Sequence, residues 1–415
     1  MPERINAVKT TFFGKGAIRL LGPELKKTGI RRALLITDRF LYKSGLTDKL
    51  ARVLSDAGIE YAVYYDVKPN PSVLVVNECL SAARAIDAKV LIALGGGSAI
   101  DTAKAVSIVM ANGGRVEQYE GVDKSQCAGL PIVAVNTTAG SGSECTSYYV
   151  VTDPKRHSKM AMEDVNCMVA IAVNDTDFMS SMPPKLTAAT GMDALTHAIE
   201  AVFSKGATPI TDKDAVWAID TVVNNLPTAV HNGGDEHART MMAYAENVAG
   251  MAFSNAGLGM VHAMAHALGG HYNLPHGICN AVLLPYVLAF DMDKNVYEDR
   301  FKTVAKALGI GGCCGSCKSG TAEHNAIEAC GMTQCTSSCG GSTAGRTLAQ
   351  AVVDRIVELN ADIGIPARLS ELQGVDPADF KALTALAMHD TCMVPNLYSV
   401  TAEDVMNVYA AAYGM

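Results

Sequence analysis

The stretch Lys89-Val-Leu-Ile-Ala-Leu-Gly-Gly-Gly-Ser-Ala-Ile-Asp101 is the part of the sequence that decides the fold. It begins with an apolar β-type run, continues through three glycines and enters a helical pattern. Glycines let a backbone approach a phosphate closely, and a helix N-terminus offers free N–H groups with partial positive charge. The stretch therefore predicts a strand–loop–helix unit that could hold a pyrophosphate at Gly96, Gly97 and Ser98. Because the Gly-x-Gly-x-x-Gly spacing of the usual dinucleotide fingerprint is absent, an ordinary strand-to-helix turn remains an alternative.

Similar apolar runs lie on either side of this unit, at residues 32–37, 61–65 and 131–135, and alternate with helix-like stretches. Such alternation predicts a parallel sheet covered by helices, with ligands bound beyond the carboxyl ends of the strands. Asp38 ends one run, where a carboxylate can accept the ribose hydroxyls of NAD and repel the 2′-phosphate of NADP, although a solvated turn aspartate is the alternative. After another run comes a small-residue loop whose hydroxyls and amides could line the cofactor, Thr137-Thr138-Ala139-Gly140-Ser141.

The character of the sequence changes at Met182-Pro183-Pro184. Beyond this point strand patterns nearly vanish, and long amphipathic stretches such as residues 185–203 and 236–253 predict helices. The two prolines suit a helix start, because the first turn does not need their missing N–H groups. We therefore predict an α/β dinucleotide-binding domain at residues 1–182 and an all-helical domain at residues 183–415.

Composition limits the classes of protein that this chain can belong to. It has 415 residues, of which 49% are hydrophobic and 18% charged, which predicts a large core and two domains. A net charge of −8 without a basic block argues against a nucleic-acid partner. The polar start of the chain does not resemble a signal peptide, and apolar runs such as residues 281–290 fall short of the roughly 20 residues that a membrane span needs. We therefore expect a cytoplasmic protein with no membrane partner.

Histidines and one aspartate recur at helical spacing in the second half. Asp193 and His197 are four residues apart, His262 and His266 repeat that spacing, and His276 follows between a proline and a glycine. A separation of four residues places two side chains on one helix face. Burying several unpaired imidazoles and a carboxylate among apolar residues is costly, so the pattern favours a cation site over core histidines. Imidazoles with one carboxylate suit Fe(II), Zn(II), Ni(II) or Co(II) better than Ca²⁺.

Cysteine usage is high, with 12 in the chain. Six of them are scattered among apolar neighbours and are predicted to be small buried hydrophobes: Cys79, Cys127, Cys145, Cys167, Cys279 and Cys392. The other six crowd, with one histidine, into a Gly/Ser/Cys/Thr-rich insertion at about residues 311–345: Cys313, Cys314, Cys317, His324, Cys330, Cys335 and Cys339. Their spacing allows a second site for zinc or an Fe–S cluster, and disulfides or free thiols in a loop are the alternatives.

Taken together, these motifs resemble the iron-containing (group III) alcohol dehydrogenases over nearly the whole chain. The resemblance is carried by Phe13-Gly-Lys-Gly16, Gly95-Gly-Gly-Ser98 with Asp101, Thr137-Thr-Ala-Gly-Ser-Gly-Ser-Glu144, Ser181-Met-Pro-Pro184, Gly191-Met-Asp-Ala-Leu-Thr-His-Ala198 and Gly259-Met-Val-His-Ala-Met-Ala-His266 with Pro275-His-Gly277. It implies a dehydroquinate-synthase-like fold, in which a nucleotide-binding α/β domain and a helical domain enclose a cleft. A homodimer or a higher homo-oligomer is also expected.

The resemblance also implies roles for individual residues. It assigns one divalent metal, Fe(II) before Zn(II) or another ion, to Asp193, His197, His262 and His276. His266 would lie beside the nicotinamide and handle a proton, with helix packing as its alternative role. NAD, rather than NADP, would bind to Asp38, Asn70, Gly96, Gly97, Ser98, Thr137, Thr138 and Lys159. Asp101 and Ser141, which lie in the same two motifs, are further candidates for the cofactor site. Tyr148 and Phe253 would wall the substrate pocket, where a tyrosine would narrow the pocket or offer a phenol to a polar substrate.

The expected function is that of a metal-dependent, NAD(H)-linked oxidoreductase, which interconverts a small primary alcohol or diol and its aldehyde by hydride transfer. Alternatives are a glycerol-dehydrogenase-like or hydroxyacid-linked relative, and a cyclase of the dehydroquinate synthase kind. The cyclase is disfavoured because Lys and Arg are scarce around the predicted ligands. A non-catalytic metal or redox sensor is the remaining alternative, and only the cysteine-rich insertion supports it.

Overall fold

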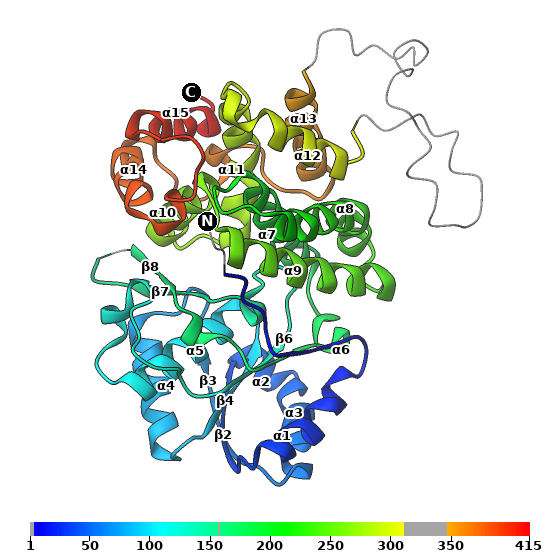
Figure 1. Ribbon diagram of the computed structural model, residues 1–415, viewed down its shortest axis with the longest axis vertical. Coiled ribbons are helices and arrows are strands. Elements are labelled where there is room, and N and C mark those ends of the chain that lie inside the picture. Colours follow the sequence, from blue (N-terminus) through cyan, green and yellow to red (C-terminus); the bar gives the residue numbers. More distant parts are fainter. Residues whose placement is uncertain (1–3, 157, 311–346) are drawn as a thin grey trace, which may run out of the picture.

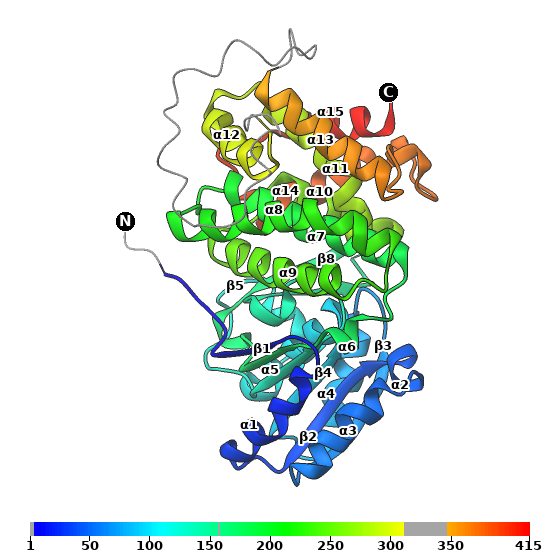
Figure 2. The same ribbon diagram turned by 90° about the vertical axis from the view of Figure 1, so that its right-hand side faces the viewer.

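The computed structural model describes residues 4–156, 158–310 and 347–415. Two parts follow one another along the long axis of the molecule. The lower part, drawn from blue through cyan to the first green, contains the strands, and the upper part, drawn from green to red, is helical (Figures 1 and 2). This arrangement confirms the predicted fold class of an α/β domain followed by a helical domain.

The first part is built on a six-stranded, all-parallel sheet with the order β1-β9-β6-β4-β2-β3. Its strands are β1 (Thr10–Phe13), β2 (Arg32–Asp38), β3 (Glu60–Val67), β4 (Val90–Gly95), β6 (Ile132–Asn136) and β9 (Ile171–Asn174). The four apolar runs of the sequence fall in β2, β3, β4 and β6, as predicted. After β2 the chain adds β3 on one side and then β4 on the other, so the order reverses between β2 and β4. Open α/β sheets bind ligands at such a reversal.

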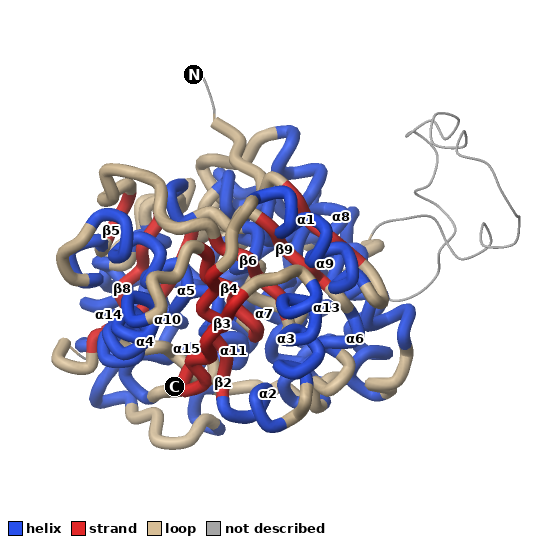
Figure 3. Tube along the Cα trace, turned by 90° about the horizontal axis from the view of Figure 1, so that it is seen from below, coloured by secondary structure: helices blue, strands red, loops and turns tan. Residues whose placement is uncertain are grey.

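Helices cover both faces of this sheet, which Figure 3 shows from below. The residues of β2 alternate between two cores, because successive side chains of a strand point to opposite faces. Leu34 and Ile36 pack with α4 (Val73–Ala85) and α5 (Gly97–Asn112). On the other face Ala33 and Leu35 pack with α1 (Leu21–Thr28) and α3 (Leu46–Asp56). Burial on both faces explains why the strands read as continuous apolar runs.

A small second sheet, which the sequence analysis did not predict, lies beside the main one. It pairs β5 (Gly121–Val122) with β8 (Ser158–Glu163), and β8 with β7 (Tyr148–Asp153) in antiparallel fashion. The hairpin β7–β8 contacts helix α10 of the helical part. It thereby carries Tyr148 and Lys159 to the junction between the two parts.

The helical part begins at Pro184, next to the predicted domain limit, and Pro183 is the N-cap residue of its first helix. No strand follows β9 within the described residues. Its helices are α7 (Pro184–Phe203), α8 (Pro209–His231), α9 (Glu236–Ala256), α10 (Met260–Tyr272), α11 (His276–Asp291), α12 (Glu298–Ala307), α13 (Leu348–Asp362), α14 (Phe380–His389) and α15 (Ala402–Tyr413). Two shorter helices, α2 (Arg39–Lys43) and α6 (Thr176–Met179), lie in the first part.

The predicted burial of the scattered cysteines is confirmed for five of them and wrong for Cys127, which is exposed. Cys127 lies in a surface loop whose backbone is held by Asn112, because Oδ1 of Asn112 accepts hydrogen bonds from the N–H groups of Gln126 and Cys127. The cysteine-rich segment with its proposed second site (Cys313, Cys314, Cys317, His324, Cys330, Cys335 and Cys339) lies outside the described residues. Among the helices that are described, none has the length and apolarity that crossing a bilayer requires.

Candidate metal centre and cofactor cleft

A cleft of about 980 Å³ runs between the ends of the sheet strands and helices α7, α9, α10 and α11. It brings together all of the predicted site residues except Thr137 and those in the segment that is not described: Asp38, Asn70, Gly96, Gly97, Ser98, Asp101, Thr138, Tyr148, Ser141, Lys159, Asp193, His197, Phe253, His262, His266 and His276. Thr137 lies just behind the lining and donates its backbone N–H to the carbonyl of Gly95.

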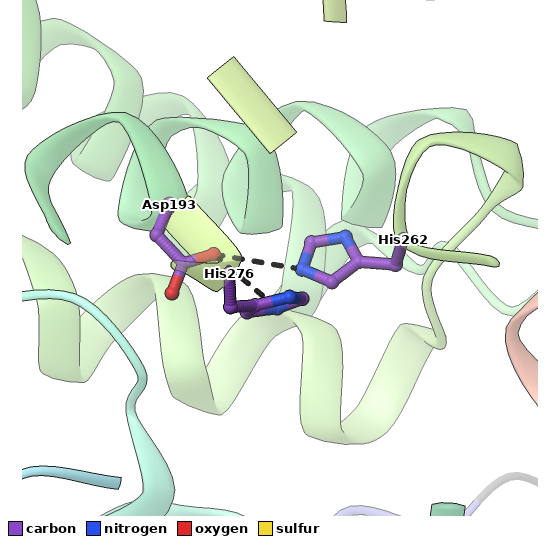
Figure 4. Close-up of side chains that lie close together, drawn as sticks. All are labelled: Asp193, His262 and His276. Carbon is purple, nitrogen blue, oxygen red and sulfur yellow. Dashed lines mark ion pairs between the residues drawn. The ribbon is translucent and has the colours of Figure 1, made fainter. Parts of the chain in front are cut away.

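Four of these side chains converge at the helical side of the cleft. Asp193 and His197 share one face of α7, His262 comes from α10, and His276 is the first residue of α11. The Nε2 atoms of His276, His262 and His197 lie 3.6, 3.8 and 3.9 Å from Oδ1 of Asp193. Figure 4 shows Asp193, His262 and His276 pointing toward one another. These three each offer a ligand atom within 4.8 Å of the others, and His197 stacks on His262 with ring centroids 4.6 Å apart.

The electrostatics of this group fit a cation. Burial lowers the pKa of each of the three histidines well below its ordinary value, so the imidazoles are neutral and keep a lone pair for a ligand. Burial also raises the pKa of Asp193 to about 7, because the hydrogen bond from Asn280 and the charge of Lys159 offset only part of the cost of burying its charge. The Nδ2 atom of Asn280 lies 2.7 Å from Asp193 Oδ1, 3.0 Å from His262 Nε2 and 3.2 Å from His276 Nε2. An amide nitrogen has only two hydrogens for these three acceptors. The donor set therefore suits a divalent transition metal.

Two carboxylates that the sequence analysis missed hold histidines of this region in place. Nδ1 of His262 donates to Oε2 of Glu200 at 2.5 Å, which leaves Nε2 as the nitrogen facing Asp193. Glu200 also accepts the N–H of Val261, and burial raises its pKa to about 8. Nδ1 of His266 donates to Oδ2 of Asp390 at 2.9 Å. Carboxylates commonly orient metal-binding histidines in this way.

The opposite end of the cleft has the geometry of a phosphate site. Helix α5 begins at Gly97, and its first turn has N–H groups without helical acceptors. A Cβ atom on Gly96 would lie 2.7 Å from Oγ1 of Thr138, and one on Gly97 would lie 3.1 Å from Oγ of Ser141. Glycine is therefore needed where the two predicted loops pack against each other.

Three further predicted cofactor residues lie along the cleft. Asp38 ends β2 and caps α2, because its Oδ1 accepts the N–H of Leu41 at 2.8 Å. Asn70 adopts a left-handed conformation with a φ of 53° and donates from Nδ2 to Oδ1 of Asn273, 3.0 Å away in the loop that precedes α11. Lys159 on β8 lines the middle of the cleft, and burial lowers the pKa of its ammonium group.

Asp101 uses both of its carboxylate oxygens within the protein. Oδ1 accepts from Oγ of Ser143 at 2.6 Å, and Oδ2 accepts from the N–H of Val150 at 3.0 Å. Its contacts thus support the loop and strand behind the cleft, and no carboxylate oxygen remains free of a protein partner.

Aromatic rings form the wall next to the histidines. The ring of Phe253 lies 4.2 Å from that of His197 and 5.7 Å from that of Tyr148, as measured between centroids. Phe253 is buried, and burial raises the pKa of the Tyr148 phenol well above its ordinary value, so the phenol stays neutral. The two predicted pocket residues therefore lie together beside His197.

Comparison with known proteins agrees with this geometry. Residues 9–176 match the family described as "Iron-containing alcohol dehydrogenase", and residues 187–332 and 328–413 match "Fe-containing alcohol dehydrogenase family, C-terminal". The chain belongs to the iron-containing alcohol dehydrogenase family. This confirms both the resemblance seen in the motifs and the predicted enzyme class.

The relatives cover nearly the whole chain. Alcohol dehydrogenase 4 of Schizosaccharomyces pombe is 41% identical over 96% of this chain and 86% of its own. Lactaldehyde reductase of Escherichia coli K12 is 36% identical over 100% of both chains. A crystal structure of a 1,3-propanediol oxidoreductase superposes with a TM-score of 0.87 at 36% identity, again over 100% of both chains. These names favour the dehydrogenase prediction over the cyclase and sensor alternatives.

Proposed function

We propose that the protein is a metal-dependent, NAD(H)-linked oxidoreductase that interconverts a small primary alcohol or diol and its aldehyde. The observation that carries this proposal is that one continuous cleft holds the glycine loop at the start of α5, the group of Asp193 with three histidines, and the aromatic wall of Tyr148 and Phe253.

Asp193, His197, His262 and His276 would hold a divalent ion, with Fe(II) the first candidate. Such an ion supplies Lewis acidity that polarises the oxygen of an alcohol or aldehyde. Glu200 fixes the ring of His262 so that Nε2 faces the other ligands. Asn280, which already donates to Asp193, keeps that carboxylate oriented.

The dinucleotide would lie along the ends of β2, β4 and β6. The N-terminus of α5 with Gly96, Gly97 and Ser98 would bind the pyrophosphate. Asp38 would accept hydrogen bonds from the adenosine ribose, which favours NAD over NADP. Lys159 would donate to the ribose or amide near the nicotinamide, because its ammonium group lines that part of the cleft.

His266 would move the proton of the reacting hydroxyl. Its Nδ1 is bound to Asp390, and its ring stacks on that of His276 at 5.0 Å. The free nitrogen, Nε2, can therefore take a proton from an alcohol, or return one to the product of aldehyde reduction. A cytoplasmic location and a homo-oligomeric state remain predictions.

Replacing His262 with Ala tests the proposal directly. We expect loss of bound metal and a fall in turnover of about 10² or more, because the variant loses a metal ligand and leaves Oε2 of Glu200 without its imidazole partner. Metal content and NADH oxidation should be measured with a panel of small aldehydes, after anaerobic reconstitution with Fe(II), Zn(II), Ni(II) or Mn(II). His237→Ala, on the first turn of α9, is the control. Full metal content with normal turnover would contradict the ligand assignment, and no turnover of any aldehyde or alcohol by wild type would contradict the function.

A further inference from the structure

A second group of possible ligands lies beside the first and shares no residue with it. His266 on α10, Asp390 at the end of α14 and Cys392 in the turn that follows each offer one ligand atom, and these atoms all lie within 4.8 Å of one another. The side chains of His266 and Asp390 are 8% and 7% exposed, and Cys392 is 4% exposed. His266 and Cys392 nevertheless line the cleft, so a small ion can reach them.

The chemistry of this group differs from that of the Asp193 group. It combines an imidazole nitrogen, a carboxylate oxygen and a thiol sulfur, and a thiolate selects a soft or borderline ion such as Zn²⁺ over Mg²⁺ or Ca²⁺. Zinc bonds of about 2.0–2.3 Å place tetrahedral ligand atoms roughly 3.3–3.8 Å apart. Ligand atoms that already lie within 4.8 Å of one another therefore need only small shifts to reach this spacing. Three protein ligands leave a fourth position open toward the cleft.

The group is also pre-organised by its own hydrogen bonds. Asp390 accepts from Nδ1 of His266 through one oxygen and from the N–H of Cys392, at 2.8 Å, through the other. The carboxylate thus joins the histidine to the turn that carries the thiol. The thiol of Cys392 also hydrogen-bonds to Asp390, so the imidazole and the thiol both converge on this one carboxylate.

We propose that His266, Asp390 and Cys392 form a second, reversible binding site for Zn²⁺ or a similar thiophilic divalent ion, and that its occupation inhibits the enzyme. On binding, the thiol releases its proton to solvent and the thiolate becomes a ligand. Nδ1 of His266 also gives up the proton that it donates to Asp390, and Nε2 takes one from solvent, so that the ring stays neutral. The inhibitory part rests on the proposed function, because an ion held there would engage His266 and fill the end of the substrate pocket. The binding part does not depend on that function.

The two sites should bind unequally. The ring of His266 stacks directly on that of His276, so an ion at the second site lies near the charge of the first and is repelled by it. The second ion should therefore be removed by dialysis under conditions in which the first is retained.

The experiment uses the full chain, loaded at the first site with Fe(II), and titrates it anaerobically with Zn²⁺. Bound iron and bound zinc are counted separately after equilibrium dialysis, and NADH oxidation with a small aldehyde is followed in parallel. A second titration with Co²⁺ monitors the near-ultraviolet charge-transfer band of a cobalt–thiolate bond. Wild type is compared with Cys392→Ser and Cys392→Ala, and with Cys127→Ser as a control in which an exposed cysteine outside the cleft is changed. The cysteines of residues 311–345 are kept in every variant, so zinc bound there contributes equally.

Support requires that wild type and Cys127→Ser bind one more equivalent of zinc than both Cys392 variants, with iron retained. The zinc concentration for half inhibition should rise about tenfold or more in the Cys392 variants, and their cobalt–thiolate band should weaken. Equal zinc binding and an unchanged band across the variants would overturn the site. Inhibition that appears only as iron is lost would overturn the mode of inhibition. Zinc equivalents and the cobalt band can be read even if no aldehyde is turned over, so failure of this inference is distinguishable from failure of the proposed function.

Discussion

Glu200 is a buried side chain that orients His262, one of the proposed metal ligands. It accepts from Nδ1 of His262 and from the N–H of Val261, so it fixes both the tautomer of the ring and the start of α10. Asp193, His197 and Glu200 recur at positions i, i+4 and i+7 of α7, so the helical pattern could have revealed this carboxylate. Asp390 could not have been found in this way, because it lies 124 residues from His266 in the sequence and approaches that histidine only in the folded chain.

Glu200→Gln should weaken metal binding by about tenfold while leaving the fold intact. The amide oxygen can still accept from His262, but the amide cannot ionise to the carboxylate that makes the imidazole a better ligand. The rate of metal loss to a chelator during dialysis measures the effect. Glu236→Gln, at the exposed start of α9, is the matched control. Metal retention equal to that of wild type would show that Glu200 only packs against His262.

Asp38 is the residue on which cofactor choice is predicted to depend. One of its oxygens caps α2 and the side chain lines the cleft, so the other oxygen is placed to meet a ribose. Asp38→Gly removes the charge that would repel a 2′-phosphate, and we expect the ratio of kcat/KM for NADH over NADPH to fall by about tenfold or more. Both cofactors should be assayed with one aldehyde. Asp66→Gly is the comparison, because Asp66 also lines the cleft, near the end of β3. An unchanged ratio in Asp38→Gly would rule out this role.

At the scale of elements, α5 joins the cofactor end of the cleft to the substrate end. Asp101 holds Ser143 and Val150, and one turn later Lys104 donates to the carbonyls of Thr146 and Tyr148 at 2.8 and 2.7 Å. These contacts fix residues 143–150, which lead into β7 and present Tyr148. The strands with continuous apolar runs were predictable because burial on both faces leaves a strong pattern. The β7–β8 hairpin was missed because only part of each strand is buried, so that neither forms a continuous apolar run.

Lys104→Met tests this link between the two ends. Lys104 is completely buried, so the variant leaves two carbonyl oxygens without a donor and Asp101 without its neighbouring positive charge. We expect a loss of roughly 2–4 kcal/mol in the free energy of unfolding, which denaturant titration measures. The KM for the aldehyde should rise more than the KM for NADH, because Tyr148, which lines the substrate end of the cleft, loses the hydrogen bond from Lys104 to its carbonyl. Lys89→Met changes an exposed lysine of the same domain and should alter neither the free energy of unfolding nor the KM values. Equal changes in both KM values would indicate general damage to the cleft and contradict a specific role.

At the scale of the whole molecule, a buried polar network joins the sheet to the helical part. Glu246 on α9 accepts from Asn136, at the end of β6, and from the N–H of Gly142. Next to it, Glu144 accepts from Asn247 of α9 and from Asn174, at the end of β9. The contacts between these residues could not be predicted from the sequence, because the partners are 30 to 110 residues apart along the chain. The two-part fold was predictable from local patterns, whereas this junction depends on long-range contacts.

The junction should make the stability of the molecule depend on pH through Glu246. Burial first, and then the charge of Glu144, raise the pKa of Glu246 well above its ordinary value of 4.5. The folded state therefore binds a proton that the unfolded state releases, and the hydrogen bond of this proton joins the two carboxyl groups. Its stabilising contribution is complete below about pH 4.5 and is lost progressively as the pH rises toward the folded-state pKa.

Glu246→Gln replaces that proton with a permanent amide N–H donor. We therefore expect the variant to have a higher Tm than wild type above neutral pH, by several degrees, and the difference to shrink toward pH 5. Calorimetry of both proteins from pH 5 to 9 gives the difference curve. Other buried carboxyls, such as Asp193 and Glu200, titrate equally in both proteins and cancel in the subtraction. Glu60→Gln, an exposed residue of β3, should follow wild type at every pH. A Glu246→Gln curve parallel to that of wild type would mean that the two carboxyl groups do not share a proton, and that the domains are held together without it.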